Sequence, residues 1–281
     1  MSDTNQSIED RKVILFLSVD IIGSTSFKNK GRTQLEWLKF FNDFYEQFPL
    51  YFLNNLEDTI SKVFPNKPEV WKSLGDELIF TFEIENHELA RGYTVAFSKS
   101  VFNYQTNNEL SLKGTAWIAG FPVINAIITS DAKNTDYIGP QIDIGFRLSK
   151  FSSNLKFIIS VELLLLLVKT SSNKLKFFIE DPQPLKGVLG DKPYPIIWIK
   201  NESSSYSKLN NLLKRYEANV DSNELSDYCE EFIKSVGKPF MIPYLKNDPL
   251  FNILPDWYEK EYKDIKNINE NSYEENMSHE N

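Results

Sequence analysis

The chain has 281 residues, of which 41% are hydrophobic and 14% aromatic, so it can bury a sizeable core in one medium domain with an extension or in two small domains. Its net charge of −8 argues against a protein that coats nucleic acid, because an acidic surface repels phosphate backbones. A single cysteine and two histidines exclude a disulfide scaffold, disfavour a structural zinc site and suit a reducing cytoplasm.

Neither a targeting segment nor a membrane-spanning segment is predicted. Residues 1–10 are polar and are expected to be flexible. The best membrane candidate, 157–168, contains Glu162 and is shorter than the roughly 20 apolar residues that a spanning helix needs. We therefore expect a cytoplasmic protein that binds neither a membrane nor nucleic acid.

The first predicted element is a strand over Val13–Val19, a continuous apolar run typical of a strand buried on both faces. Asp20 ends this run, and a turn rich in Gly, Ser and Thr follows, which favours the start of a helix. Helical spacing then extends over Leu35–Leu53, where Pro49 is expected to kink or end the helix.

The middle of the chain alternates predicted strands and helices. Val70–Phe82 is typical of a hairpin around a Gly-Asp turn, and Glu88–Asn103 has the pattern of a helix. The remaining predicted elements are a strand-rich stretch over 110–129, a loop and helix start at 139–149, apolar segments at 157–169 and 174–179, and a last strand at 195–200. This alternation predicts an α/β or α+β domain.

The composition changes near Lys200. A polar linker is followed by helical periodicity over 208–236, which predicts a small helical C-terminal extension over 201–265. The last stretch, 266–281, is rich in Asn and Glu and has almost no apolar residues, so disorder is expected there.

Two carboxylates are candidates for chemistry. Asp20 lies at the end of a buried strand, where the following turn offers N–H groups to a phosphate, although such an Asp could simply cap the next helix. Asp76, at the tip of the hairpin SLGDEL, alone suits ordinary turn chemistry. As a pair at the ends of adjacent strands, they could hold two Mg²⁺ ions about 3.5–4 Å apart for attack on phosphorus.

Four segments resemble, in the same order, the class III adenylyl and guanylyl cyclase domain. They are FLSVDIIGST, KSLGDELIF, DYIGPQIDIGFRL and LKGVLGDKPYPIIWI. The resemblance implies an α+β, ferredoxin-like catalytic domain over 11–200, with an antiparallel-rich central sheet and flanking helices. It also implies a cyclase that acts on a nucleoside triphosphate with two divalent ions, Mn²⁺ or Mg²⁺, in a homodimer.

The resemblance assigns Asp20 and Asp76 to the metal ions, together with the backbone carbonyl of Ile21. It assigns Lys186 to the triphosphate, although the family's lysine can also be aligned with Val188. The turn that would wrap the triphosphate consists of Gly23, Ser24, Thr25, Ser26 and Phe27.

The resemblance places the remaining catalytic and base-reading residues in the second half of the domain. Arg147 matches the transition-state arginine, whose guanidinium would neutralise charge on the α-phosphate. Asp143 stands where the family usually has Asn, and an ionised Asp cannot donate a hydrogen bond. Lys72 and Asp136 align with the pair that reads adenine in adenylyl cyclases. In this family the site lies between two subunits, so Asp20 and Asp76 would come from one protomer and Asp136, Asp143 and Arg147 from the other.

Two departures from the family pattern resemble a subgroup. IDIGFR replaces the usual VNxAxR, and KGTAWIAGFP replaces the usual strand with His-Thr-Gly. These departures resemble the pyrimidine cyclases of the Pycsar antiphage system, which make cyclic UMP or cyclic CMP for a separate effector. The resemblance implies UTP, or CTP, as substrate and an aromatic residue near the first helix in base selection, for which Tyr45 is the candidate. Trp37, Trp71 and Trp117 could also narrow the pocket, but each taken singly is better explained as part of an ordinary core.

Three alternatives remain at this point. A purine cyclase is favoured by Lys72 and Asp136, whereas a catalytically inactive nucleotide-binding module is opposed by the presence of both metal carboxylates. A polymerase-like palm enzyme would need a basic template groove, which the net charge does not suggest. The two histidines, His87 and His279, lie in polar surroundings, so no general-base histidine is predicted.

Overall fold

The computed structural model describes residues 11–29, 31, 33–62, 68–107, 110–131, 134–169, 175–200 and 221–278. Its centre is a seven-stranded sheet in the order β2-β3-β1-β4-β7-β9-β8, and β5 and β6 form a separate hairpin. The strands are β1 (Lys12–Ile21), β2 (Val70–Leu74), β3 (Glu77–Ile84), β4 (Leu112–Phe121), β5 (Ala126–Asp131), β6 (Asn134–Ile138), β7 (Lys156–Ile159), β8 (Phe177–Pro184) and β9 (Pro193–Lys200).

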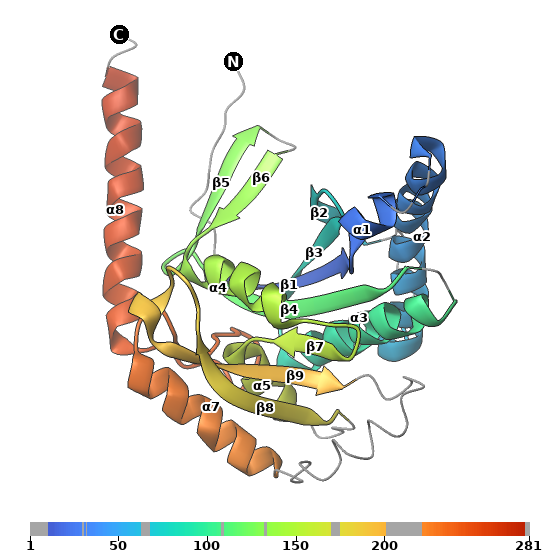
Figure 1. Cartoon of the computed structure of the whole chain (residues 1–281). Coiled ribbons are helices and arrows are strands. Elements are labelled where there is room, and N and C mark those ends of the chain that lie inside the picture. The colour runs from blue at the N-terminus through green and yellow to red at the C-terminus, as the bar shows by residue number, and fades with distance from the viewer. Residues whose placement is uncertain are drawn as a thin grey trace.

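Helices flank this sheet (Figure 1). They are α1 (Ser24–Asn29), α2 (Gln34–Ile60), α3 (His87–Asn107), α4 (Pro140–Leu148), α5 (Val161–Val168), α7 (Ser222–Val236) and α8 (Asp256–Ser278), with short 3-10 turns at Ser149–Phe151 and Leu189–Asp191. In the part of the chain that the structure describes, every strand pair of the sheet is antiparallel except β4 with β7. The predicted α+β class with an antiparallel-rich sheet is therefore confirmed.

The central strand β1 is buried along its whole apolar run, as predicted for Val13–Val19. It pairs with β3 on one side and β4 on the other, so its side chains alternate between the two faces of the sheet. One face packs on α2, α3 and α5 in the main core, and the other packs on α4 and the β5–β6 hairpin in a smaller aromatic cluster. A strand covered on both faces needs no polar alternation, which explains the continuous apolar run.

The helix α2 differs from its prediction. It starts at a capping box, in which Thr33 and Glu36 satisfy each other's backbone N–H groups, and it continues through Pro49 to Ile60. Pro49 is buried together with Phe48 and Phe52. The expectation was that Pro49 would kink or end the helix, and the helix does not end there. Apolar packing on both sides of Pro49 outweighs the one backbone hydrogen bond that proline removes.

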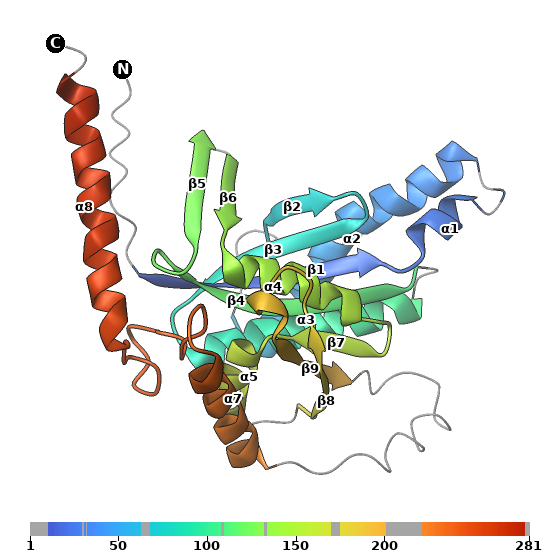
Figure 2. The same cartoon turned by 60° about the vertical axis from the view of Figure 1, so that its left-hand side comes forward.

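The hairpin β5–β6, residues 126–138, is called the arm below. It leaves the body of the domain between β4 and α4 and projects away from the sheet (Figure 2). Its inner side chains, Ile127 and Tyr137, pack on the smaller aromatic cluster. The arm therefore connects a projecting surface directly to the second core.

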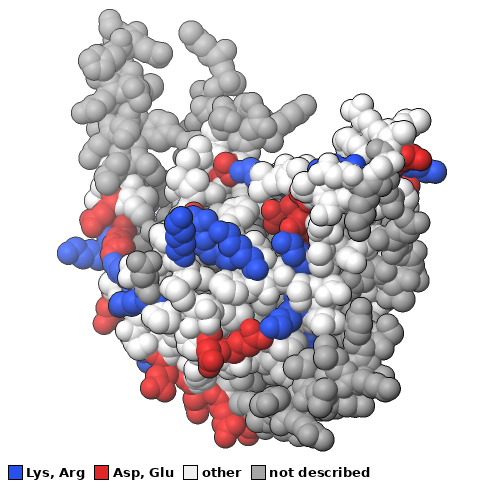
Figure 3. Space-filling model, viewed as in Figure 1, with Lys and Arg blue, Asp and Glu red and all other residues white. Residues whose placement is uncertain are grey.

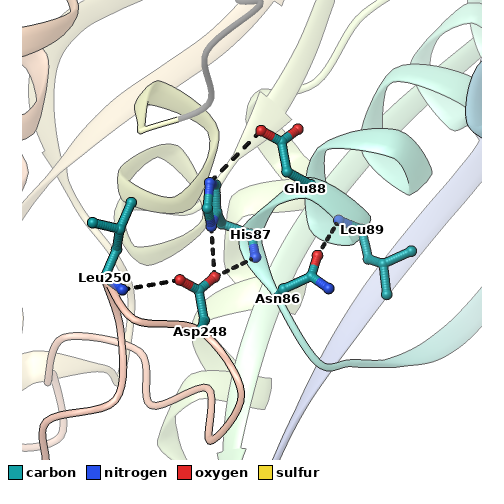
Figure 4. A network of polar contacts seen from close by, with 6 residues as sticks. All are labelled: Asn86, His87, Glu88, Leu89, Asp248 and Leu250. Carbon is teal, nitrogen blue, oxygen red and sulfur yellow. Dashed lines mark hydrogen bonds and ion pairs between the residues drawn. The ribbon is translucent and has the colours of Figure 1, made fainter.

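The C-terminal extension is held to the domain that contains the seven-stranded sheet at separate points. Asp248 accepts a 2.8 Å hydrogen bond from the backbone N–H of His87 and contacts the His87 ring (Figure 4). Tyr258 donates to the Phe121 carbonyl over 3.1 Å, and Arg11 forms a 2.8 Å ion pair with Glu259. His87 is therefore engaged in a structural contact.

The extension also departs from the sequence prediction. The helix α8 continues to Ser278, into the segment 266–281 for which disorder was expected. Most of the predicted linker and part of the predicted helix, 201–220, lie outside the described residues, and α7 begins at Ser222. Of the helices in the described part of the chain, none is both long enough and apolar enough to cross a bilayer.

Candidate functional site

Strand pairing brings acidic side chains together at one end of the sheet. Asp20, near the end of β1, lies opposite Glu77 of β3 on one side and opposite Lys113 of β4 on the other. Asp76 lies at the tip of the β2–β3 hairpin, and its carbonyl accepts a 3.3 Å hydrogen bond from the N–H of Ile21. We call Asp20, Asp76, Glu77 and Lys113 the acidic half of the site. The two carboxylates predicted as a pair are thus neighbours.

The charges of the acidic half act on one another. Burial raises the pKa of Asp20, the Lys113 ammonium at 2.9 Å opposes this, and the charge of Asp76 raises it further. Burial also raises the pKa of Glu77, opposed by the hydroxyl of Ser18, while the charge of Asp20 adds to the rise. Three carboxylates with one lysine leave negative charge that a cation would neutralise.

This donor set suits a hard divalent cation. Mg²⁺ and Mn²⁺ prefer oxygen ligands, and Mg²⁺ is commonly held by one or two carboxylates together with the phosphates of a substrate. The carboxylates of Asp20 and Asp76 meet that requirement. Within the described ranges, no group of three or more His, Cys, Asp or Glu side chains is arranged to hold a metal ion.

Sequence reasoning missed Lys113 and Glu77. Lys113 is the second residue of β4, and only the antiparallel register places it opposite Asp20. Glu77 directly follows the predicted Asp76, so its proximity could have been read from the hairpin. The signal that could have found Lys113 is a single lysine among buried residues at the start of a strand.

The turn after β1 is held close to the acidic half. Gly23 has a positive φ of 69°, and its carbonyl accepts a 2.9 Å hydrogen bond from the N–H of Phe27. Phe27 is half-buried and meets Phe40 edge to face at 5.2 Å between ring centroids, so it anchors the turn to α2. Thr25 and Ser26 are exposed together with Gly23, whereas Ser24 is buried.

The second group of predicted residues lies on α4. Asp143 and Arg147 are one turn apart on this helix, so they share a face. Asp143 is exposed and Arg147 is half-buried, and the buried Nε of Arg147 has no hydrogen-bond partner among the described residues. A guanidinium with an unused donor is suited to an anion that the chain itself does not supply.

The predicted base-reading pair forms within one chain. Lys72, on β2, donates to both carboxylate oxygens of Asp136, on the arm, over 2.9 and 3.0 Å. Next to this pair, Trp71 donates to the carbonyl of Thr135 over 2.9 Å, and the N–H of Tyr137 donates to Asp136. About half of the Asp136 side chain is exposed, so its polar edge is accessible from outside.

An aromatic cluster lies beneath the Lys72–Asp136 pair. Phe16 stacks on Trp117 with centroids 5.3 Å apart, and its edge meets Trp71 and Tyr137. Trp117 is buried under α4, so it is a core residue. A Cβ added to Gly145 would lie 2.2 Å from the Trp117 ring, so the IDIGFR motif needs its glycine for the helix to lie on this indole.

The turn between β8 and β9 holds both positions considered for the triphosphate lysine. Lys186 is exposed, whereas Val188 is largely buried and offers an apolar side chain. Lys192 and Lys238 instead line, with Asp143, a cavity of about 260 Å³ beside the start of α4. Sequence reasoning missed Lys192, because only the folded turn brings it to α4.

Of the aromatic candidates for base selection, Tyr45 lies on α2 and donates its hydroxyl to the carbonyl of Gly75 at the hairpin tip. That hydroxyl also accepts a 3.4 Å hydrogen bond from Ser73. Since Ser73 and Lys72 are successive residues of β2, they point to opposite faces, and Tyr45 lies across the strand from the Lys72–Asp136 pair. Trp37 packs on Phe41 with centroids 5.8 Å apart, as part of the α2 packing.

We call α4 with Asp143 and Arg147, the Lys72–Asp136 pair and Lys192 the basic half. Figure 3 shows, on one face of the molecule, basic side chains gathered over α4 and a smaller acidic group beside the β2–β3 hairpin. The two halves are thus presented side by side on one surface. Charges of opposite sign on one face allow two copies of the chain to face each other with complementary charges.

Comparison with known proteins gives likeness in structure and none in sequence. No family model and no curated protein matches the sequence. The adenylyl cyclase CyaB from P. aeruginosa is 14% identical with a TM-score of 0.51, and the match covers 70% of this chain and 97% of that one. The guanylyl cyclase Cya2 is 17% identical with a TM-score of 0.50, and the match covers 71% of this chain and 98% of that one. The chain has the fold of class III nucleotide cyclase catalytic domains.

Proposed function

We propose that the protein is a nucleotide cyclase that converts UTP, or alternatively CTP, into the 3′,5′-cyclic monophosphate and pyrophosphate. The observation that carries the proposal is the juxtaposition of Asp20 and Asp76 at neighbouring strand ends of a cyclase-like sheet. The burial and mutual repulsion that raise the pKa of Asp20 support a site that gains from a bound cation. A module that had lost catalysis would have no need to keep such a pair.

The reaction forms one bond and breaks one. The ribose 3′-oxygen attacks the α-phosphorus, the bond to the bridging oxygen of the β-phosphate breaks, and pyrophosphate leaves. Two divalent ions, Mn²⁺ or Mg²⁺, would lower the pKa of the 3′-hydroxyl and neutralise the leaving group when bound. Asp20 and Asp76, together with the carbonyl of Ile21, would hold these ions. The proton of the 3′-hydroxyl would pass to a water or to the substrate.

The chain's other residues position the triphosphate and stabilise the transition state. The guanidinium of Arg147 meets the charge that develops on the α-phosphate. The turn Gly23–Phe27 supplies backbone N–H groups, and Lys113 and Lys192 are the cations best placed to meet the β- and γ-phosphates, with Lys186 as the weaker candidate. Asp143 replaces a usual asparagine, and we assign it to orienting the ribose as an acceptor.

We propose that the active enzyme is a homodimer with two equivalent sites, each made from the acidic half of one protomer and the basic half of the other. Opposite charge on the two halves of one face supports this arrangement, since a two-fold axis brings each half against its complement. The product would serve as a second messenger for a separate effector in antiphage defence. The protein itself would not bind that effector.

We infer a pyrimidine substrate from the surroundings of the Lys72–Asp136 pair. Trp71 and Tyr137 lie directly against this pair, with ring centroids 5.0 Å apart, and Phe16 packs on both rings. Bulky rings leave less room for a purine than small side chains would. Tyr45 lies across β2 from this pair, so its role in base selection stays a prediction from the resemblance.

A purine cyclase is the second candidate, because the Lys72–Asp136 pair is intact and accessible. Incubation of the purified protein with Mn²⁺ and each of ATP, GTP, CTP and UTP, with products separated by chromatography, tests both. Cyclic UMP or cyclic CMP as the main product supports our proposal. Cyclic AMP or cyclic GMP as the main product contradicts the pyrimidine assignment, and no cyclic product from an intact dimer contradicts the cyclase itself.

Mixing two inactive variants tests the shared site. Asp76→Ala removes the acidic half and Arg147→Ala the basic half, so each homodimer should be inactive. Coexpressed chains should regain about a quarter of wild-type activity, since random pairing makes half of the dimers mixed and each mixed dimer has one intact site. Activity that stays at the level of the single variants would contradict the shared site.

The defence role is tested in cells. Bacteria that express the protein together with a cyclic-nucleotide-sensing effector should form fewer plaques upon phage challenge, and Asp76→Ala should abolish this protection. Equal protection by Asp76→Ala would show that any defence does not depend on cyclase activity.

A further inference from the structure

Three buried polar side chains meet at the base of the arm. Asn125 lies in the turn before β5, Gln141 in the first turn of α4, and Glu162 in the first turn of α5, and each is at most 5% exposed. Buried polar groups are costly unless they are hydrogen-bonded, so a group of three indicates a specific role. We call these three residues the joint.

The joint ties together the end of β4, the arm and α4. Gln141 accepts hydrogen bonds through Oε1 from the N–H of Gly120 and from the Asn125 amide, both over 2.8 Å. Asn125 in turn donates to the Gly120 carbonyl over 2.9 Å and accepts from the N–H of Gln141 over 3.2 Å. Every bond in this set crosses from one segment to another, so the set fixes their relative positions.

The residues that flank the arm, Asn125 and Gly139, also touch directly. Gly139, which follows the arm, has a φ of +142°, and a Cβ placed there would lie 2.4 Å from Oδ1 of Asn125 and 2.8 Å from its Cα. A side chain at position 139 would therefore push the arm away from α4. The backbone at this point is closed as tightly as glycine allows.

Glu162 connects the joint to the rest of the chain. Its carboxylate accepts a 3.1 Å hydrogen bond from Nε2 of Gln141. The other polar atom of that side chain, Oε1, accepts the hydrogen bonds from Gly120 and Asn125. Glu162 and Gln141 border a cavity of about 20 Å³ whose other side is formed by the extension through Met241, Pro243, Tyr244 and Tyr258. A space of this size holds no nucleotide, so it is a junction between two parts of the chain.

We propose that Gln141, held by Asn125 and Glu162, is a positioning residue that sets α4 and the arm against the sheet, and that the C-terminal extension completes this joint. This inference rests on the proposed cyclase function for its catalytic consequence. Through the joint, the extension is coupled to Arg147 on α4 and to Asp136 on the arm. Neither Gln141 nor Glu162 touches the reacting atoms.

The geometry of α4 makes this coupling effective. Gln141 and Arg147 are six positions apart, about 9 Å along the helix axis. A tilt of about 10° at the start of the helix would move Arg147 by about 1.5 Å. A misplacement of about 1 Å in a catalytic group can cost about 100-fold in rate.

The test compares variants of the full-length protein by hydrogen exchange and by kinetics. Gln141→Leu removes all three side-chain hydrogen bonds of Gln141, whereas Glu162→Leu removes the acceptor for its Nε2 and also the hydrogen bond of Glu162 with Tyr194. Glu162→Gln keeps an acceptor at that place and should restore wild-type behaviour. Asn55→Leu is the matched control, because the Asn55 amide joins α2 to α3 far from the joint.

We expect exchange in peptides covering 122–148 to accelerate about tenfold in Gln141→Leu and less in Glu162→Leu, with α2 and α3 unchanged. The kcat of both should fall more than KM rises, while Mn²⁺ binding to the acidic half stays at the wild-type value. Equal exchange in 122–148 for wild type and Gln141→Leu would overturn the proposal, as would the same change in Asn55→Leu. The exchange result holds or fails without any cyclase activity, so it separates this proposal from the proposed function.

Discussion

The two halves of the candidate site are held by different kinds of structure. In the acidic half, Asp20, Glu77 and Lys113 occupy matched positions on three adjacent strands, so backbone pairing fixes where each side chain starts. In the basic half, Arg147 and Asp136 lie on a nine-residue helix and on a projecting hairpin. Their position depends on a few buried side-chain contacts at the base of both elements.

This difference indicates where the protein is rigid and where it can be adjusted. Central strands open only with the whole domain, whereas an arm and a short helix can move when a local joint opens. In the homodimeric enzyme that we propose, the carboxylates of the acidic half must keep a constant separation, whereas the basic half can be adjusted by whatever completes its joint. The C-terminal extension is the element placed to do so.

The largest expected effect comes from removing charge in the acidic half. Asp20→Asn keeps the shape of the side chain but removes a metal ligand, so we expect cyclase activity to fall about 10³-fold or more. Since the buried charge of Asp20 is itself unfavourable, the melting temperature should stay within about 3 °C of wild type. Initial rates, Mn²⁺ titration calorimetry and thermal unfolding measure these quantities. A variant that keeps a tenth of the activity would show that Asp20 holds no essential ion.

The next effect isolates the basic half. Arg147→Lys keeps the charge but loses the planar fork, so we expect kcat to fall about 100-fold. Mn²⁺ binding should not change, because Asp20 and Asp76 of the same chain are untouched. Steady-state kinetics and calorimetry on one preparation make the comparison. If the affinity for Mn²⁺ falls together with kcat, the two halves are not independent within a protomer.

The third prediction concerns the joint and pH. Burial raises the pKa of Glu162 from 4.5 to about 7, against the opposing effect of its hydrogen bonds. Between these values the folded state binds more protons than the unfolded state, so the free energy of unfolding falls as pH rises. Glu162→Gln cannot titrate, so at pH 8 it should be more stable than wild type by about 3 kcal/mol at most.

Denaturant unfolding of both proteins at pH 4 and pH 8 measures this difference. At pH 4 both side chains are neutral, and the two proteins should be nearly equally stable. A stability difference that is the same at both pH values would show that Glu162 does not titrate in this range.

The smallest expected effect concerns the packing of α4 on the Trp117 ring. Gly145→Ala places a methyl group 2.2 Å from the Trp117 ring, so the helix must shift, at a cost of about 1–3 kcal/mol in unfolding free energy. Trp117→Phe is the companion variant, and the double variant should cost less than the sum of the two single ones. Additive costs would mean that Gly145 and Trp117 do not constrain each other.

Much of the acidic half could be predicted from sequence, because its signals are local. A continuous apolar run ending at Asp20 and a Gly-Asp hairpin around Asp76 are short patterns, and they led to the right strands and to the right neighbours. Their roles in metal binding remain predictions. The same local reasoning was wrong about the end of α2 at Pro49 and differs from the structure over 266–278, where helix replaces the expected disorder.

By itself, the sequence determined most of the elements, since hydrophobic period and turn chemistry act over a few residues, whereas the α+β class and the pairing of Asp20 with Asp76 came from the resemblance to cyclase segments. Only the tertiary structure decided that Lys113 lies against Asp20, that Val188 is buried while Lys192 borders a cavity with Asp143, and that Trp117 lies under Gly145. It also decided that Asn125, Gln141 and Glu162 meet. These contacts join segments far apart in the chain, and strand register and helix packing, which no short pattern encodes, bring them together.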